Sequence, residues 1–226
     1  MGNKLIKLCN YIFLLIIAIT SIASIRTINS LNSKNIIYID PGHGGPDGGA
    51  VGIDGIYEKE IVLTISNRLK RYLTESGYNV VLTRTENYDL ADDNSKNKKR
   101  EDIHNRVKLI NNSNCLLFVS IHANKYSSPG VYGSQVFYRS KDEESKILSD
   151  EIQESLKAIL QNTKRVAKSI SGKYLMDHTR PPGSLVEVGF LSNPEEAKAL
   201  LDDYYQERVA YAIYIGILSY LEKVNN

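Results

Sequence analysis

The sequence lacks tryptophan, has only two cysteines and carries almost no excess charge. Cys9 and Cys115 are too few for the disulfide framework of small secreted folds, and Cys115, just ahead of an apolar run, is expected to be a small buried side chain. With 28 basic and 26 acidic side chains, the chain has no broad basic surface that would favour nucleic acid as a partner. Its 226 residues can instead bury the core of one ordinary domain without covalent support.

The N-terminus has the pattern of an export signal. Lys4 and Lys7 precede an uncharged, mostly apolar run with a small-residue cleavage pattern at 21–23. This run is also close to the ~20 residues that span a bilayer, so removal and retention as an anchor both stay open. We expect residues 1–25 to be a signal peptide or signal anchor and residues 26–35 to be a linker. The folded part would then be exported, secreted or membrane-anchored, with membrane contact only through this segment.

Strand and helix patterns alternate along the rest of the chain, from residue 36 to residue 222. Short apolar runs with branched side chains predict strands at 36–40, 79–84, 116–121, 134–138 and 184–190. Apolar residues at helical spacing predict helices at 61–76, 102–111, 143–160 and 204–221. This alternation predicts a single three-layer α/β domain, with a mostly parallel sheet covered by helices on both faces.

One polar segment interrupts the alternation. Residues 85–101 are rich in Asp, Asn and Lys, with Tyr88 and Leu90 as the main apolar positions. Such a composition buries too little apolar surface to pack, which favours a solvated loop. Long loops in compact domains also often contact substrates or partners, which favours a functional excursion. The sequence leaves both interpretations open.

Two histidines follow predicted strands at the positions where open α/β sheets bind ligands. His43 lies in a glycine-rich turn after the first strand, and His122 ends the third strand. A lone histidine is more often structural, but two at equivalent strand ends favour a metal, because imidazole is the commonest zinc ligand. His104 lies in a charged helix and is expected on the surface, whereas His178 lies in a loop before the last strand.

A catalytic zinc usually has three protein ligands, and the third is expected to be Glu58 or Glu60. Ile61, Ile65 and Leu69 form one apolar stripe at about 100° per residue. If the helix extends back far enough, Glu58 projects onto this stripe, where a buried acid needs a partner. Glu60 projects toward solvent and fits a first-turn carboxylate favoured by the helix dipole. Glu58 is therefore the better ligand.

Glu187 lies inside the last predicted strand, where an unpaired carboxylate is costly. One interpretation is a buried ion pair with Arg84 or Arg106. The other is a general base next to the metal, which takes a proton from water and passes it to the leaving amine. We favour the second interpretation.

Four short motifs together resemble the zinc-dependent N-acetylmuramoyl-L-alanine amidases. They are IDPGHGG at 39–45, Glu58-Lys59, SIHAN at 120–124 and LVEVGFLSN at 185–193. The motifs occur in this order, and the resemblance spans about 36–222, the whole expected catalytic domain. It implies that zinc is held by His43, Glu58 and His122 and that Glu187 is catalytic.

The resemblance also implies a substrate and a setting. Members of this family cut the amide between the lactyl group of N-acetylmuramic acid and the L-alanine of the peptidoglycan stem peptide. Residues 83–84, 88–92 and 111–113 are most similar to the germination-specific amidases of spore formers. Those enzymes remove stem peptides from spore cortex, a step toward muramic-δ-lactam. We therefore expect a zinc hydrolase that acts on peptidoglycan, of the cortex or the cell wall, on the forespore or cortex side of the membrane.

Three other functions are compatible with parts of this pattern. A non-catalytic peptidoglycan-binding module would keep the fold but lack a ligand or the base, and none is missing. A zinc peptidase acting on the stem peptide would use the same metal chemistry, so only its products distinguish it. An amidase that is inactive until a partner protein orders its zinc site is also compatible with the sequence, with residues 85–101 as a contact.

Overall fold

The computed structural model describes residues 35–52 and 55–225. The expected signal segment at 1–25 and nearly all of the expected linker at 26–35 lie outside these residues. The strands are β1 Ile36–Pro41, β2 Asn79–Leu82, β3 Leu117–Asn124, β4 Gln135–Arg139, β5 Lys168–Ile170 and β6 Gly183–Phe190. The helices are α2 Glu58–Glu75, α3 Lys98–Asn111, α4 Glu143–Leu160, α5 Tyr174–His178, α6 Pro194–Ala199 and α7 Asp203–Asn225. None of these helices is long and apolar enough to cross a membrane.

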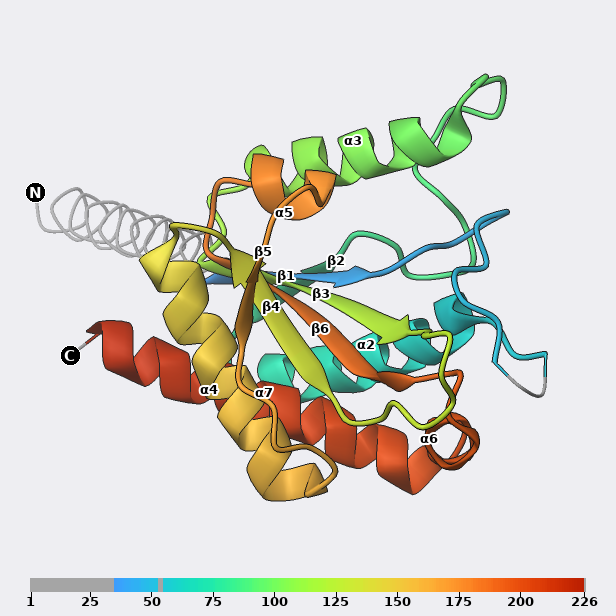
Figure 1. Cartoon of the computed structure of the whole chain (residues 1–226). Helices are drawn as coiled ribbons and strands as arrows, with labels where there is room; N and C mark the ends of the chain where they lie inside the picture. Colours follow the sequence, from blue (N-terminus) through green and yellow to red (C-terminus); the bar gives the residue numbers. More distant parts are fainter. Residues whose placement is uncertain (1–34, 53–54, 226) are drawn as a thin grey trace, which may run out of the picture.

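The strands form one sheet in the order β2-β1-β3-β6-β4-β5 (Figure 1). Strands β1, β2, β3 and β6 run parallel to one another. Strand β4 pairs antiparallel with β6 and parallel with β5. Helices α2, α4 and α7 cover one face of the sheet, and α3 and α5 cover the other (Figure 1). The predicted α/β domain, with a mostly parallel sheet between two helical layers, is therefore confirmed.

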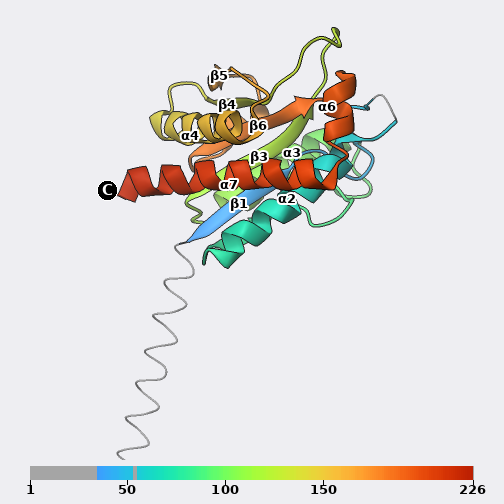
Figure 2. The ribbon, with the colours of Figure 1, turned by 90° about the horizontal axis from the view of Figure 1, so that it is seen from below.

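The larger hydrophobic core lies between the sheet and α2, α4 and α7. On α2 the predicted stripe of Ile61, Ile65 and Leu69 is buried there, because helical spacing places these side chains on one face. Helix α7 crosses this layer between α2 and α4 (Figure 2). It approaches α4 closely at Gly216, where an added Cβ would lie 2.5 Å from the Cα of Ile152. A smaller core fills the space under α3 and α5.

The structure differs from the predicted elements in several places. Helix α2 begins at Glu58, three residues before the predicted start at 61, and strand β2 ends at Leu82 rather than at 84. Elements β5, α5 and α6 were not predicted, because each is too short to show a periodic pattern. Cys115 is only partly buried, beside the smaller core, and this burial raises the pKa of its thiol.

Candidate active site

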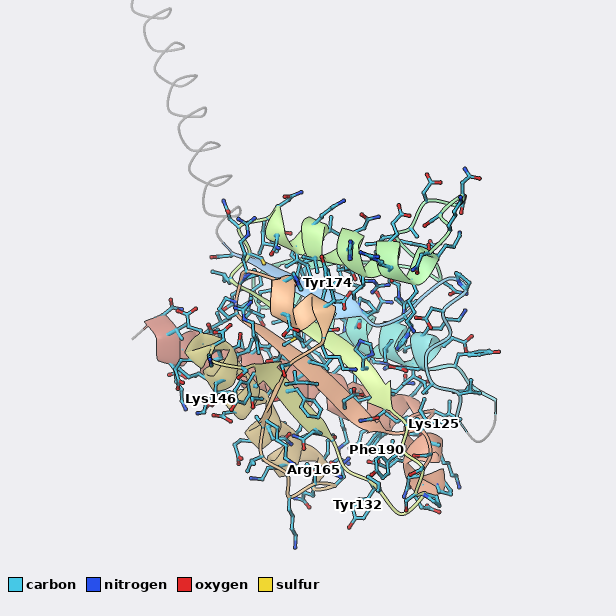
Figure 3. The ribbon with its side chains drawn as sticks, turned by 45° about the horizontal axis from the view of Figure 1, so that its top comes forward. Lys125, Tyr132, Lys146, Arg165, Tyr174 and Phe190 are labelled. Carbon is cyan, nitrogen blue, oxygen red and sulfur yellow. The ribbon has the colours of Figure 1, made fainter. Side chains whose placement is uncertain are left out.

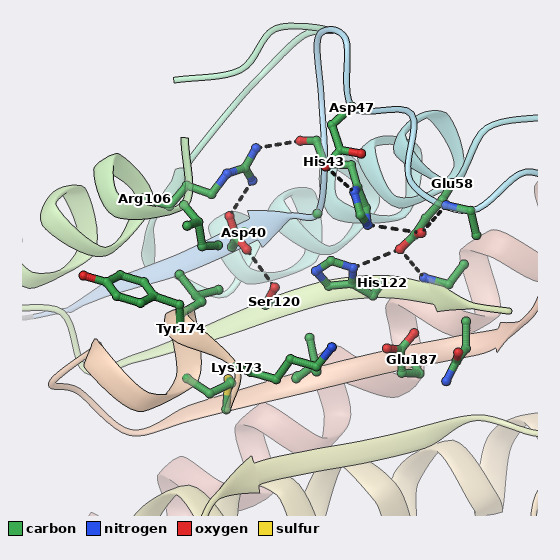
Figure 4. A pocket seen from close by; sticks show the side chains of 18 of the residues that line it. Asp40, His43, Asp47, Glu58, Arg106, Ser120, His122, Lys173, Tyr174 and Glu187 are labelled. Carbon is green, nitrogen blue, oxygen red and sulfur yellow. Dashed lines mark hydrogen bonds and ion pairs between the residues drawn. The ribbon is translucent and has the colours of Figure 1, made fainter. Parts of the chain in front are cut away.

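The three predicted ligands meet at the carboxyl edge of the parallel strands (Figure 4). His43 follows β1, His122 lies in β3, and Glu58 is the first residue of α2. One ligand atom of each lies within 4.8 Å of the others, so the group could hold a metal ion. Parallel β1 and β3 end at the same edge, which brings these distant residues together. Glu58 is 4% exposed while Glu60 is exposed, so α2 buries the acid that helical spacing selected.

Glu58 lies between the two histidines. Its Oε1 is 2.9 Å from Nδ1 of His122 and accepts the backbone N–H of Ala123 at 2.9 Å. Its Oε2 is 3.2 Å from Nε2 of His43 and accepts the backbone N–H of Ala50 at 2.8 Å. The two backbone donors orient the carboxylate independently of the histidines, as outer hydrogen bonds do for metal ligands.

These contacts shift the proton affinities of the site. Burial alone would raise the pKa of Glu58, but hydrogen bonds with His122 and His43 hold it well below its ordinary value. Burial alone would lower the pKa of His43, but Glu58 and Asp47 raise it on balance. Nδ1 of His43 lies 3.0 Å from Oδ2 of Asp47, an ion-pair distance without hydrogen-bond geometry. A bound metal would replace the protons that now link these groups.

Two glycines let the backbone approach the cluster closely. A Cβ added to Gly42 would lie 2.3 Å from Cε1 of His122, inside the imidazole ring's contact distance. Gly49 has a φ of +70°, and its added Cβ would lie 2.6 Å from Oε2 of Glu58 and 2.7 Å from Cδ2 of His43. The site therefore requires glycine at both positions, at the first for space and at the second for space and backbone conformation.

Glu187 lies beside the cluster. It is the register neighbour of His122 across the parallel pair β3 and β6, so both side chains leave the same face of the sheet. Its Oε2 is enclosed and has no hydrogen-bond partner. Burial raises the pKa of Glu187, although electrostatic interactions with His122 and Lys173 oppose this. The alternative interpretation, an ion pair with Arg84 or Arg106, is wrong, because both arginines bind other groups.

A buried charge network supports the turn that contains His43. Arg106 on α3 donates to Oδ1 of Asp40 at 2.8 Å and to the carbonyl of His43 at 2.6 Å. Its Nε also donates to the two carboxylate oxygens of Asp102, at 3.1 and 2.9 Å. Arg106 and Asp40 are each 1% exposed, so this is a paired interior network rather than a surface contact.

Arg84 holds the same turn from another direction. It is completely buried and donates to the carbonyl of Pro41 at 3.0 Å and to that of Gly42 at 2.8 Å. The two arginines thus fix the backbone before His43, a role that the sequence did not suggest. The available signal was the spacing of Asp102 and Arg106, an i,i+4 pair on a predicted helix.

The polar segment at 85–101 is irregular up to residue 97, and residues 98–101 form the first turn of α3. Much of it is exposed, as expected of a solvated loop. Two residues in its first part nevertheless contact the surroundings of the site: Oδ1 of Asn87 accepts the N–H of Gly45 at 3.1 Å, and the N–H of Leu90 donates to Asp102 at 2.8 Å. The segment therefore packs against the turn that carries His43 and against the helix that anchors this turn.

All four predicted site residues line one pocket of about 400 Å³. The other two histidines stand apart from it. His104 and His178 stack on opposite sides of Tyr174, which is labelled in Figure 3. The ring centroid of Tyr174 lies 4.3 Å from that of His104 and 3.9 Å from that of His178. His104 is partly buried by this stack rather than fully on the surface, and His178 ends α5.

Several proteins with similar sequences are N-acetylmuramoyl-L-alanine amidases. The family model described as N-acetylmuramoyl-L-alanine amidase matches residues 37–219. The germination-specific N-acetylmuramoyl-L-alanine amidase of Bacillus subtilis is 48% identical over 188 residues, which are 82% of this chain and 79% of that relative. The amidase LytC of the same organism is 34% identical over 186 residues, which are 81% of this chain but only 35% of that longer relative.

Solved structures lead to the same family. The CwlD amidase from Clostridioides difficile, in complex with the GerS lipoprotein, has a TM-score of 0.81 and 40% identity, covering 84% of this chain and 99% of that chain. The catalytic domain of the amidase CwlV from Bacillus (Paenibacillus) polymyxa has a TM-score of 0.74 and 32% identity, covering 83% and 98%. The family model spans most of the chain, and these relatives carry the same fold. This chain belongs to the N-acetylmuramoyl-L-alanine amidase family.

Proposed function

We propose that this amidase uses zinc, held by His43, Glu58 and His122, and that Glu187 is its general base. The single observation that carries the proposal is the position of Glu187. It lies in register with His122, in the same pocket as the three donors, and one of its oxygens is enclosed without a partner. A general base beside a candidate metal needs such a free oxygen.

The donor set fits zinc. Two nitrogens and a carboxylate form a ligand set common in catalytic zinc sites, which keep one position open. Ligands about 2.0–2.1 Å from a tetrahedral ion lie roughly 3.3 Å apart. The observed contacts of Glu58 with the two histidines, at 2.9 and 3.2 Å, are close to this spacing. All three donors are neutral or anionic once deprotonated, as a divalent cation requires.

The proposed metal and Glu187 would then have separate roles in the reaction. A bound zinc ion would supply Lewis acidity that polarises the substrate carbonyl and makes water more acidic. Glu187 would accept a proton from the attacking water at its unpartnered oxygen. It would then deliver this proton to the nitrogen of the leaving L-alanine, because an amine leaves far more readily when protonated. Burial, which raises the pKa of Glu187, favours this transfer.

The substrate we propose is the N-acetylmuramoyl-L-alanine amide of peptidoglycan, in the spore cortex. Support comes from the B. subtilis relative, which is a germination-specific amidase. Peptidoglycan lies outside the cytoplasm, so we propose that residues 36–222 form a catalytic domain that is exported by the segment at 1–25 and joined to it by the linker at 26–35. Release of the stem peptide would leave the muramic acid carboxyl free for conversion to the lactam.

The test is to incubate the chain with purified cortex peptidoglycan, with and without added zinc, and to read the products by mass spectrometry. Free peptides that begin with L-alanine are expected only when zinc is bound. Glu187→Gln should keep zinc and lose at least about a hundredfold in turnover, since proton transfer contributes 10²–10⁴-fold. His122→Ala should lose the metal itself.

Each rival function predicts a different result in this assay. Cleavage within the peptide would identify a stem-peptide peptidase. Binding to cortex that is unchanged by Glu187→Gln, without any product, would identify a binding module. The relative from C. difficile is in complex with a lipoprotein. A comparable requirement here would appear as low zinc occupancy of the purified chain, with activity restored by a partner protein.

A further inference from the structure

One lysine in the pocket makes no hydrogen bond and no close ion pair with any residue that the structure describes. Lys173 immediately precedes α5 and lines the pocket together with Glu187. In Figure 4 its side chain extends along the pocket toward Glu187. Among residues 35–52 and 55–225, its ammonium group makes no hydrogen bond and no close ion pair, and its charge acts on Glu187 from a greater distance, where it lowers the pKa of that carboxyl. An exposed ammonium group in a pocket is available to a ligand.

The other cations that line this pocket already have partners. Nζ of Lys99 lies 3.2 Å from Oδ2 of Asp47. Nζ of Lys125, near the end of β3 in Figure 3, donates to the carbonyl of Val51 at 3.1 Å. The buried Arg106 of α3 binds two aspartates and two backbone carbonyls. Lys173 therefore differs from these cations in having no hydrogen bond and no close ion pair, within the part of the chain that the structure describes.

The charge around Lys173 indicates what it would bind. Glu187 and Glu58 line the same pocket, so an anionic ligand would be repelled there unless a cation offset them. An ammonium group beside the general base supplies this offset. A lysine is a point charge with three donors, and a single carboxylate suits it. The pocket is thus arranged for a ligand that has a carboxylate a short distance from the cleaved bond.

The proposed substrate has such a group. In the stem peptide, L-alanine is followed by D-glutamate linked through its γ-carboxyl, which leaves the α-carboxylate of D-glutamate free. Consecutive Cα atoms of a chain are about 3.8 Å apart, so this carboxylate lies within about two residue lengths of the cut. We propose that Lys173 binds the α-carboxylate of the second stem-peptide residue. This inference rests on the proposed function and assigns the peptide side of the cleaved bond to the segment before α5.

The experiment compares two muropeptides that differ only in this group. One carries D-glutamate with a free α-carboxylate, and the other carries the α-carboxamide. Zinc-loaded wild type, Lys173→Met and Lys173→Arg are assayed on both, with Lys198→Met on α6 as the control for loss of one positive charge. Lys173→Met should lower kcat/KM for the acidic muropeptide roughly three- to tenfold, mainly through KM, as for a partly exposed ion pair. On the amidated muropeptide it should match wild type.

The remaining variants separate other roles of Lys173. Lys173→Arg should retain most of the preference for the acidic muropeptide, because it keeps the charge, and Lys198→Met should behave as wild type. An equal loss on both muropeptides, with a shifted pH profile, would mean that Lys173 acts through Glu187 and would overturn the inference. An unchanged preference in Lys173→Met would overturn it as well. If wild type released no peptide from either muropeptide, the proposed function itself would fail.

Discussion

The space available for one added carbon atom determines whether the proposed ligands of the site can come together. His122 lies against the backbone of Gly42, and an added Cβ would be 2.3 Å from its ring. Because the two arginines fix this turn, the ring rather than the backbone would have to move. Gly42→Ala should therefore lower zinc affinity at least about tenfold, since displaced ligands lose affinity in this range. Zinc affinity is measured by competition with a chelator dye.

Gly52→Ala is the matched control for this substitution. Its added Cβ would have no neighbour closer than the carbonyl oxygen of Ile56 at 3.6 Å, an ordinary contact. Zinc affinity and melting temperature should both stay near the wild-type values. Equal zinc affinities of Gly42→Ala and wild type would show that the turn relaxes, contrary to the expectation.

Asp40 links the site to stability at low pH. Burial alone would raise its pKa, but Arg106, Thr83 and Ser120 lower it from 3.8 to about 2. A lowered folded-state pKa contributes stability above the unfolded pKa, and this contribution is lost as the pH falls from about 4 to about 2. A difference of this size corresponds to about 2 kcal/mol. The unfolding free energy of wild type should therefore fall more steeply below pH 4 than that of Asp40→Asn, as measured by denaturant titration of the zinc-free chain. Parallel pH curves would contradict this assignment.

At the scale of elements, the position of the first turn of α2 determines which acid reaches the site. Glu58 is buried against both histidines, whereas Glu60, two residues later, is exposed. Glu58→Gln removes the carboxylate of the proposed ligand set, and we expect it to lower zinc affinity at least about tenfold. Glu60→Gln should bind zinc as wild type does. Isothermal titration with zinc measures both variants, and equal affinities of the two would remove Glu58 from the ligand set.

The long elements could be predicted from the sequence, because their apolar spacing is set by the core that they cover. The stripe on α2 even indicated Glu58 before the start of the helix was known. The reversed direction of β4 could not be predicted, because an apolar run is the same in either direction. Strand β5 and helix α5 follow no period over their few residues, so the segment that presents Lys173 had no signal.

The buried charge network around Arg106 also could not be predicted from the sequence. Strand ends predicted where His43 and His122 lie, because that edge is common to all parallel strands. The partners of Arg106 depend on how α3 lies over the sheet, and three of its four acceptors belong to residues more than sixty positions earlier. Side-chain hydrogen bonds of this kind follow from tertiary packing, not from local pattern.

At the scale of the whole molecule, the contact between α4 and α7 closes the larger core. Gly216 sits in the interior of α7, and an added Cβ would lie 2.5 Å from the Cα of Ile152 and 2.8 Å from its N. These are backbone atoms, so the helices would have to separate. Gly216→Ala should therefore lower the melting temperature by about 2–6 °C, because overpacking by about 1–3 kcal/mol outweighs the gain of about 1 kcal/mol in helix propensity.

Ser219→Ala, one turn later on α7, is the matched control and should leave the melting temperature nearly unchanged. Calorimetry of the two variants measures the difference. Zinc affinity should be unaffected in both, because α7 lies on the face of the sheet away from the pocket. A melting temperature of Gly216→Ala at or above that of wild type would show that α4 and α7 shift apart without cost.

The order of the strands along the chain has a consequence for how activity arises during synthesis. The three proposed ligands all belong to the portion that ends with β3, whereas Glu187 arrives with β6, which pairs beside β3 only later. A growing chain therefore contains every proposed metal ligand before it contains the proposed general base. Proton transfer by Glu187 becomes possible only once the last strand of the site has been made and has paired with β3.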